Sequence, residues 1–367
     1  MKIEQLTVEN FKCFKREQTF DFSRLTILTG ANSSGKSSVI YAILMALQSE
    51  GFPNSLSTNG DYVNLGDFKN ISHSNNSKNI IQIGFQVYDN DFPSLDGSIN
   101  IKTYWEEDEK NLLPKNVGIN SQYSRIDISN REIMRGFSYT ALRAINYISA
   151  FRQAPRRTYL EKNKANFKIE TDGEGYIDQI VEWDKRANGK IKQLIETMKE
   201  LDLIEDIKIN RLGGGRFEVL VKPVNNNGFS ALSDVGSGVS AFMPIIVADL
   251  QLPNDSTLFL AEPEIHLHPS VQAKFIDYII HQINTTDKNY VIETHSEYFL
   301  NRIRLAIVKR ELKKKDVKVY FLENTKEDTN VFDVDFTETG AIKNAPRNFF
   351  ETYSIDVMDI ALNAFAE

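Results

Sequence analysis

Cysteine is nearly absent from this chain of 367 residues, in which Cys13 is the single thiol. One thiol can form neither a disulfide within the chain nor a zinc site of several cysteines. Apolar runs of membrane-spanning length are also lacking, and residues 1–8 alternate between apolar and polar, unlike the continuous apolar stretch of a secretory signal. These absences predict a globular protein of the reducing cytoplasm without a membrane partner.

A positive net charge is missing as well. The formal charge of −7 at pH 7 argues against a protein that coats DNA by neutralising many phosphates. Local DNA contact stays open because two basic clusters occur, although the spacing of the second suits the exposed side of a helix. The first consists of Arg152, Arg156, Arg157, Lys162 and Lys164, and the second of Lys309, Arg310, Lys313, Lys314 and Lys315.

Hydrophobic residues make up 41% of the chain, enough to bury a substantial core. Residues 3–8 and 18–22 alternate like strands, residues 25–29 form a buried strand that enters a glycine loop, and residues 37–48 have helical spacing. Residues 79–105 predict a second, antiparallel sheet, and residues 176–204 predict an insertion of one or two helices. We therefore expect an α/β fold with a mixed or parallel core sheet, an antiparallel β subdomain and a helical insertion lobe. The predicted boundaries are 1–160 and 226–367 for the two halves of the core and 161–225 for the lobe.

The glycine loop carries the strongest chemical signal. Residues 30–37, GANSSGKS, match the pattern GxxxxGK[ST] between a strand and a helix. Its glycines permit a tight wrap whose N–H groups point at phosphate. Lys36 would reach the β and γ phosphates, and the Ser37 hydroxyl would bind Mg²⁺. The expected ATP site comprises Gly30, Asn32, Ser33, Ser34, Gly35, Lys36, Ser37 and Ser38.

Two further apolar strands end in polar residues. Residues 258–269, LFLAEPEIHLHP, place Glu262 at a strand end, where a carboxylate can polarise the attacking water and contribute to the metal site. His266 and His268 lack a third clustered ligand, so hydrogen bonding or loop placement is favoured over metal binding. Residues 290–296, YVIETHS, place His295 at the same edge of a parallel sheet, where it can sense the γ-phosphate.

A segment of small residues precedes another apolar helix. Residues 232–240, LSDVGSGVS, which we call the signature segment, can form a second anion-binding nest through Ser237 and Gly238. An ordinary helix N-cap with flexible glycines is an equally good interpretation of this segment alone. Since one chain rarely needs two phosphate nests, the nest would serve the nucleotide of a second subunit.

In this order, the four motifs resemble those of ATPases of the ABC/SMC class, and most closely the OLD-like AAA ATPases of bacterial and phage-conflict loci. The resemblance implies an ABC/SMC-type P-loop domain that forms head-to-head homodimers or higher oligomers, with ATP clamped between the P-loop of one subunit and Ser237 of the other. It also implies a Q-loop glutamine, for which Gln153 competes with Gln48, and it places His268 where the class has an interface aspartate. Ala261 departs from the class, which has an acidic residue there to support the Mg²⁺ shell.

The resemblance predicts an ATPase that hydrolyses ATP, slowly if Ser37 and Glu262 alone hold the metal, and that controls a partner effector such as a nuclease or toxin in anti-phage defence. One alternative is an OLD-type nuclease, with Glu323, Asp333 and Asp335 as a degenerate metal site. On the simpler interpretation, Asp333 and Asp335 are outward residues of an alternating strand. Another alternative, suggested by Ala261, is a scaffold that binds ATP without hydrolysing it.

Overall fold

The structure is a computed structural model that describes residues 2–88, 98–123, 143–162, 165–186, 189–346 and 349. Its central sheet has the strand order β16 (Ile342–Lys343), β15 (Thr329–Phe336), β14 (Val317–Asn324), β3 (Leu25–Gly30), β13 (Asn289–Glu293), β12 (Thr257–Ala261) and β7 (Ile145–Ile148). The strands from β14 to β7 are parallel, whereas β15 and β16 are antiparallel to their neighbours. The carboxyl ends of β3, β13 and β12 therefore meet at one edge.

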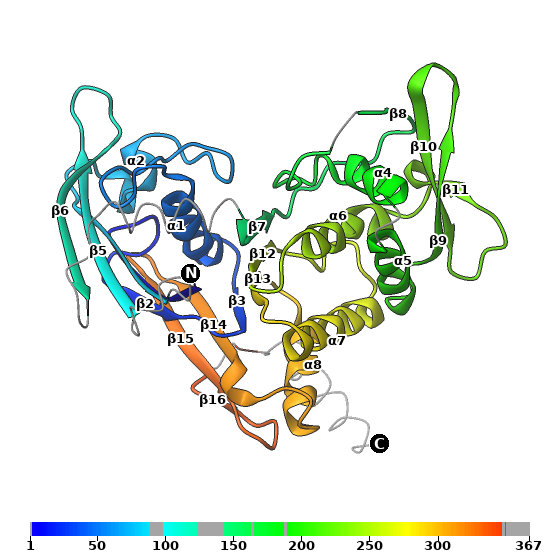
Figure 1. Cartoon of the computed structure of the whole chain (residues 1–367). Coiled ribbons are helices and arrows are strands. Elements are labelled where there is room, and N and C mark those ends of the chain that lie inside the picture. Colours follow the sequence, from blue (N-terminus) through cyan, green and yellow to red (C-terminus); the bar gives the residue numbers. More distant parts are fainter. Residues whose placement is uncertain are drawn as a thin grey trace.

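A second sheet is antiparallel throughout. Its order is β2 (Gln18–Asp21), β1 (Lys2–Glu9), β4 (Ile81–Tyr88), β5 (Ser98–Glu107) and β6 (Pro114–Tyr123). Helix α1 (Lys36–Gln48) shares one apolar core with this sheet and with one face of the central sheet, and the short α2 (Phe68–Ile71) adds to it (Figure 1). The predicted antiparallel sheet is thus present, although residues 89–97 of its segment lie outside the described part.

The other face of the central sheet is covered by α6 (Ser237–Gln251), α7 (Pro269–Thr285) and α8 (Glu297–Val308) (Figure 1). Alternation along the buried strands divides them between the two cores. Ile27 and Ile292 face the side of α6 to α8, whereas Leu28 and Val291 face α1. This mixed α/β arrangement, with helices on both faces, confirms the predicted fold class.

The insertion lobe contains both helices and strands. α4 (Tyr176–Arg186) and α5 (Lys190–Glu200) contact α6. They share its core with the small sheet of β8 (Tyr159–Leu160), β9 (Ile204–Arg211), β10 (Arg216–Pro223) and β11 (Ser230–Ala231). The insertion, predicted to hold one or two helices, contains two, and a β hairpin completes the lobe. The boundaries at 160 and 225 stay a prediction.

The basic clusters differ from the expectation in one respect. α8 ends at Val308, so the five basic residues of the second cluster, all exposed, follow the helix in a turn and a short 3-10 helix, and the expectation of a helical face was wrong. In the first cluster Arg157 pairs with Asp234 and Lys162 with Asp178, while Lys164 lies outside the described residues. No helix in the described part of the chain is long and apolar enough to cross a membrane.

Candidate functional site: a nucleotide-binding edge

The P-loop connects β3 to α1 in a conformation that requires glycine at two positions, Gly30 and Gly35. Gly30 has φ 136°, and a Cβ atom on it would lie 2.1 Å from the carbonyl oxygen of Leu322 on β14. Gly35 has φ 102° and caps α1, and a Cβ atom there would lie 2.2 Å from Sγ of Cys13. The loop conformation that exposes the backbone N–H groups is therefore also the one that lets Gly30 pack against β14 and Gly35 pack against Cys13.

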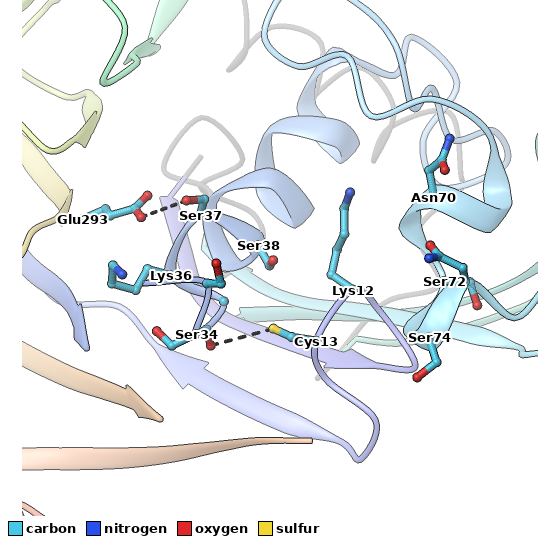
Figure 2. A pocket seen from close by; sticks show the side chains of 13 residues that line it. Lys12, Cys13, Ser34, Lys36, Ser37, Ser38, Asn70, Ser72, Ser74 and Glu293 are labelled. Atoms are coloured by element: carbon cyan, nitrogen blue, oxygen red, sulfur yellow. Dashed lines mark hydrogen bonds between the residues drawn. The ribbon is translucent and has the colours of Figure 1, made fainter. Parts of the chain in front are cut away.

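Lys36 and Ser37 occupy the first turn of α1. Lys36 is 3% exposed, and its Nζ donates hydrogen bonds to the carbonyls of Ala31 (2.9 Å) and Gly30 (3.3 Å). Burial lowers the pKa of Lys36, and the nearby carboxylates of Glu293, Glu262 and Glu264 oppose that shift. Ser37 Oγ donates to Oε1 of Glu293 at 2.8 Å (Figure 2).

The ends of β12 and β13 bring Glu262 and His295 together. Oε1 of Glu262 lies 3.8 Å from Nε2 of His295, and the left-handed backbone of Glu262 (φ 45°) is held by a hydrogen bond from its N–H to the carbonyl of Glu293. Burial and the charge of Lys36 lower the pKa of His295, against the raising effect of Glu262, and so favour the neutral form of its imidazole. Lys36, Ser37, Glu262 and His295 are therefore at one edge, as the sequence predicted.

Glu264 forms hydrogen bonds with the segment that carries His295. Its Oε1 accepts hydrogen bonds from Thr294 Oγ1 and from the backbone N–H of His295, both at 2.7 Å. Burial raises the pKa of Glu264. The carboxylate thus fixes the chain immediately after β13 and with it the position of the imidazole.

Glu293 is the residue at this edge to which the sequence analysis gave no role. It is 4% exposed, and its Oε2 has no hydrogen-bond partner within the described structure. Burial raises its pKa, while the hydrogen bond from Ser37 and the charge of Lys36 act in the opposite direction. The signal that could have identified it is a carboxylate at the end of the apolar strand Asn289–Glu293, since ionised side chains are rarely buried without a partner.

A cavity of about 400 Å³ opens beside the P-loop (Figure 2). Ser33, Ser34, Gly35, Lys36, Ser37 and Ser38 line it together with Glu293. Its other walls were not predicted and consist of Lys12, Cys13, Asn70, Ser72, Ser74 and Asn75. These residues come from the loop after β1 and from the region of α2, so segments that lead from or into strands of the antiparallel sheet complete the cavity. Nothing in their local sequence distinguishes them from ordinary loop residues.

Other predicted binding residues do not line this cavity. Asn32 lies exposed in the P-loop, and Ser237 is exposed at the start of α6. A Cβ atom on Gly238 would lie 2.8 Å from the carbonyl oxygen of His266, so packing within one chain already requires glycine there. No residue of the described signature segment is among the cavity's lining.

The two competing glutamines have different settings. The Gln48 side chain exchanges hydrogen bonds with the backbone of Ser57, Tyr62 and Val63, which engages both its donors and both its acceptor sites. Gln153 instead lies exposed in the segment after β7, where its Nε2 donates to Asp172. This setting favours Gln153 as the Q-loop residue, which stays a prediction.

Arg152 joins the same segment to the end of β12. Its guanidinium donates to the carbonyls of Ser149 (3.0 Å), Ala261 (3.4 Å) and Glu262 (3.3 Å). Burial lowers the pKa of Arg152, and the charges of Glu264 and Glu262 oppose that shift. Arg152 therefore connects the backbone of residues 261 and 262 to the segment that contains Gln153.

His268 is the N-cap residue of α7. Its Nδ1 accepts a hydrogen bond from the N–H of Ser270 and so caps α7, and it also contacts the Ser270 hydroxyl at 2.8 Å. Among the residues that the structure describes, no group of three or more His, Cys, Asp or Glu residues could hold a metal ion.

The strand register places the three carboxylates of the nuclease alternative on two different faces of the sheet. Asp333 pairs with Tyr320, whereas Glu323, three residues further along β14, pairs with Asn330. Side chains alternate between faces along a strand, so Glu323 projects to the face opposite Asp333 and Asp335. The two aspartates form ion pairs with Lys318 and Lys314. The three carboxylates therefore do not converge.

The fold and this edge define a P-loop domain, and solved structures of Smc heads agree with it in fold. A head domain of Smc bound to the C-terminal winged-helix domain of ScpA matches with 14% identity and a TM-score of 0.56, covering 91% of this chain and 98% of that one. The Pyrococcus furiosus Smc head with an extended coiled coil, bound to the C-terminal domain of ScpA, matches with 13% identity and a TM-score of 0.54 over 100% of both chains.

The family is given by the sequence itself. Residues 25–301 match the family described as "AAA domain, putative AbiEii toxin, Type IV TA system". The match covers more than half of the chain, which therefore belongs to this family of AAA domains. Comparison with curated proteins gave no significant match.

Proposed function

We propose that this protein binds ATP with Mg²⁺, hydrolyses it between two copies of the chain, and uses the resulting change in association to control a partner protein. The observation that carries the proposal is the convergence of Lys36, Ser37, Glu262 and His295 at the ends of three neighbouring parallel strands, beside a cavity. Ligands of open α/β sheets bind at this edge.

Each residue has a role that its chemistry suits. Lys36 and the N–H groups of residues 33–38 bind the phosphates, and Glu262 polarises the attacking water. The neutral imidazole of His295 senses the γ-phosphate as a hydrogen-bond partner. Ser37 and the carboxylates near it suit a hard divalent cation, because the buried Oε2 of Glu293 has no partner within the described structure. When bound, Mg²⁺ neutralises phosphate charge.

The second half of the site comes from another copy of the chain. Ser237 is exposed at the N-terminus of the 15-residue helix α6, where backbone N–H groups can meet an anion. The signature segment does not line the cavity of its own chain, as expected if it serves the nucleotide of the partner. ATP would then join two copies head to head.

An effector partner and a role in anti-phage defence are supported by the family, whose name refers to a putative toxin of a toxin–antitoxin system. An OLD-like character fits the same setting. The Smc heads of similar fold are bound to domains of ScpA, which shows a head of this fold in complex with another protein. The partner here would be a nuclease or toxin.

The test is phosphate release and binding of a fluorescent ATP analogue by wild type, Lys36→Ala and Glu262→Gln. We expect Lys36→Ala to lose binding, and Glu262→Gln to keep binding but lose at least about 100-fold in turnover, since it removes the base. Lys326→Ala and Glu338→Gln make the same changes at exposed sites and should behave as wild type.

The non-hydrolysing scaffold is the second candidate, and the observation that favours it is the methyl group at Ala261. It predicts tight nucleotide binding that Lys36→Ala abolishes, with equal background phosphate release from all proteins. That result would overturn the ATPase proposal and leave the binding proposal standing.

A further inference from the structure

Ala261 leaves the predicted metal site without the acidic residue that its class has at that position, and the strand next to it ends in one. β12 and β13 are parallel, and their register pairs Ala261 with Glu293. Glu293 in turn pairs with Leu28 on β3, the strand that leads into the P-loop. Paired residues of neighbouring parallel strands project to the same face, so the methyl and the carboxylate both point toward α1. The carboxylate therefore stands one strand nearer the P-loop than the missing acid would.

Only one of the two carboxylate oxygens of Glu293 has a hydrogen-bond partner in the described structure. Oε1 accepts the hydrogen bond from Ser37 Oγ at 2.8 Å, whereas Oε2 is buried and has no hydrogen-bond partner in the described part of the chain. Glu293 is 4% exposed, and a buried carboxylate is unstable in its charged form unless a cation or hydrogen-bond donors compensate it. Lys36 directs its Nζ to the carbonyls of Gly30 and Ala31. Glu293 thus offers a free oxygen next to the hydroxyl predicted to bind Mg²⁺.

We propose that Glu293 supplies the carboxylate of the Mg²⁺ shell, from the strand beside the P-loop and in place of the acid that is missing at Ala261. The proposal rests on the proposed function, since it concerns the metal that accompanies ATP. Mg²⁺ takes oxygen ligands and is commonly held by one or two carboxylates together with substrate phosphates. Glu293 then belongs to the metal, and Glu262 is left to act on water.

Glu264 is the rival at this edge, because its Oε2 is also buried without a partner within the described structure. Its Oε1, however, is engaged by Thr294 and by the backbone of His295, not by the P-loop. Its carboxylate therefore positions the chain after β13. This difference makes Glu264→Gln the matched control, since it replaces a buried carboxylate of the same edge by the same amide.

The test is the affinity for Mn²⁺, a paramagnetic substitute for Mg²⁺, measured by electron paramagnetic resonance on the full chain with saturating AMP-PNP. We expect Glu293→Gln to weaken Mn²⁺ binding about 10–100-fold, the usual loss when a group that supports a metal site is removed. Its affinity for AMP-PNP in EDTA should equal that of wild type. Glu264→Gln should bind Mn²⁺ as wild type does.

Wild-type Mn²⁺ affinity in Glu293→Gln would overturn the inference and leave the proposed function intact. Equal loss of AMP-PNP binding with and without metal would also overturn it, since Glu293 would then shape the loop. If wild type itself fails to bind AMP-PNP, the proposed function fails instead. Thermal unfolding checks that the variants fold. If Glu293→Gln does not fold, Glu293→Ala removes the carboxylate without burying an amide, and the same comparison applies.

Discussion

At the residue scale, Gly30 is required by the packing of the central sheet as well as by the phosphate loop. It follows the buried strand β3, and the space where a side chain would begin is filled by the carbonyl of Leu322 on the adjacent strand. Its φ of 136° is moreover one that residues other than glycine rarely adopt. The first glycine of the loop is therefore fixed by packing before any nucleotide binds.

We predict that Gly30→Ala lowers the free energy of unfolding by about 3 kcal/mol or more, because backbone strain and overlap with a strand add together. Gly213→Ala is the control, since nothing lies within 4 Å of a Cβ atom there. Urea unfolding followed by circular dichroism measures both. Equal stability of the two variants would contradict the packing argument.

Lys168 yields a second prediction at this scale. Its Nζ donates to the Ile145 carbonyl at 2.8 Å and to the Tyr62 hydroxyl at 2.5 Å. Burial lowers its pKa from 10.5 to about 8, against the raising effect of Asp61 and Glu170. Because the folded-state pKa is the lower one, the unfolded chain binds more protons between pH 8 and 10.5, and stability rises with pH across that window.

We therefore expect wild type to gain about 1 kcal/mol of unfolding free energy relative to Lys168→Met between pH 7.5 and 9.5, a value reduced for partial exposure of the lysine. Subtracting the curve of the variant removes the contribution of other titrating groups. Urea titrations at the two pH values provide the measurement. A difference that stays constant with pH would show that the pKa of Lys168 is not lowered.

At the scale of elements, the register of β14 and β15 argues against the nuclease alternative. It places Glu323 on the face opposite Asp333 and Asp335, and the lysines of β14 and of the turn before it neutralise both aspartates. A metal-dependent nuclease needs its carboxylates within reach of the same ions. The structure therefore agrees with the simpler interpretation, in which Asp333 and Asp335 are outward residues of an alternating strand.

We predict that the protein alone does not cleave supercoiled DNA with Mg²⁺ or Mn²⁺, and that Asp333→Ala changes the unfolding free energy by less than about 1 kcal/mol, as expected for an exposed ion pair. Plasmid nicking assays and urea unfolding are the measurements. Cleavage that Asp333→Ala abolishes and Lys36→Ala leaves unchanged would establish the nuclease.

At the scale of the whole molecule, the two halves of the proposed composite site lie apart within one chain. The cavity is lined by the P-loop, the start of α1, the loop after β1 and the region of α2, whereas Ser237 is exposed on α6, which packs against the other face of the central sheet (Figure 1). Two copies arranged head to head would each complete the site of the other. Hydrolysis would then depend on association.

Mixing two inactive variants tests this arrangement. In equal amounts, Lys36→Ala and Ser237→Arg should recover about a quarter of wild-type ATP turnover, because half of the dimers pair the two variants and each of these contains one complete site. A mixture of Lys36→Ala and Glu262→Gln is the control and should stay inactive, since both residues belong to the same half. No recovery in the first mixture would contradict the shared site.

The sequence by itself determined the features that depend on neighbours along the chain. The strand, loop and helix from residue 25 to residue 48 are local, so spacing and glycine pattern sufficed to place Lys36 and Ser37. The strands that carry Glu262 and His295 end in polar residues after apolar runs, a signal that also needs no partner. These parts of the site follow from local propensity.

The tertiary structure alone decided what depends on register and on distant segments. Glu293 reaches Ser37 across 256 positions of sequence because β13 lies between β12 and β3, and no local pattern contains that strand order. Lys12 and Asn70 line the same cavity as the P-loop because α1 and the antiparallel sheet share one apolar core, which brings these distant segments together. Glu323 and Asp333 lie on opposite faces for a similar reason, since a shift of one residue in pairing exchanges the faces of a strand.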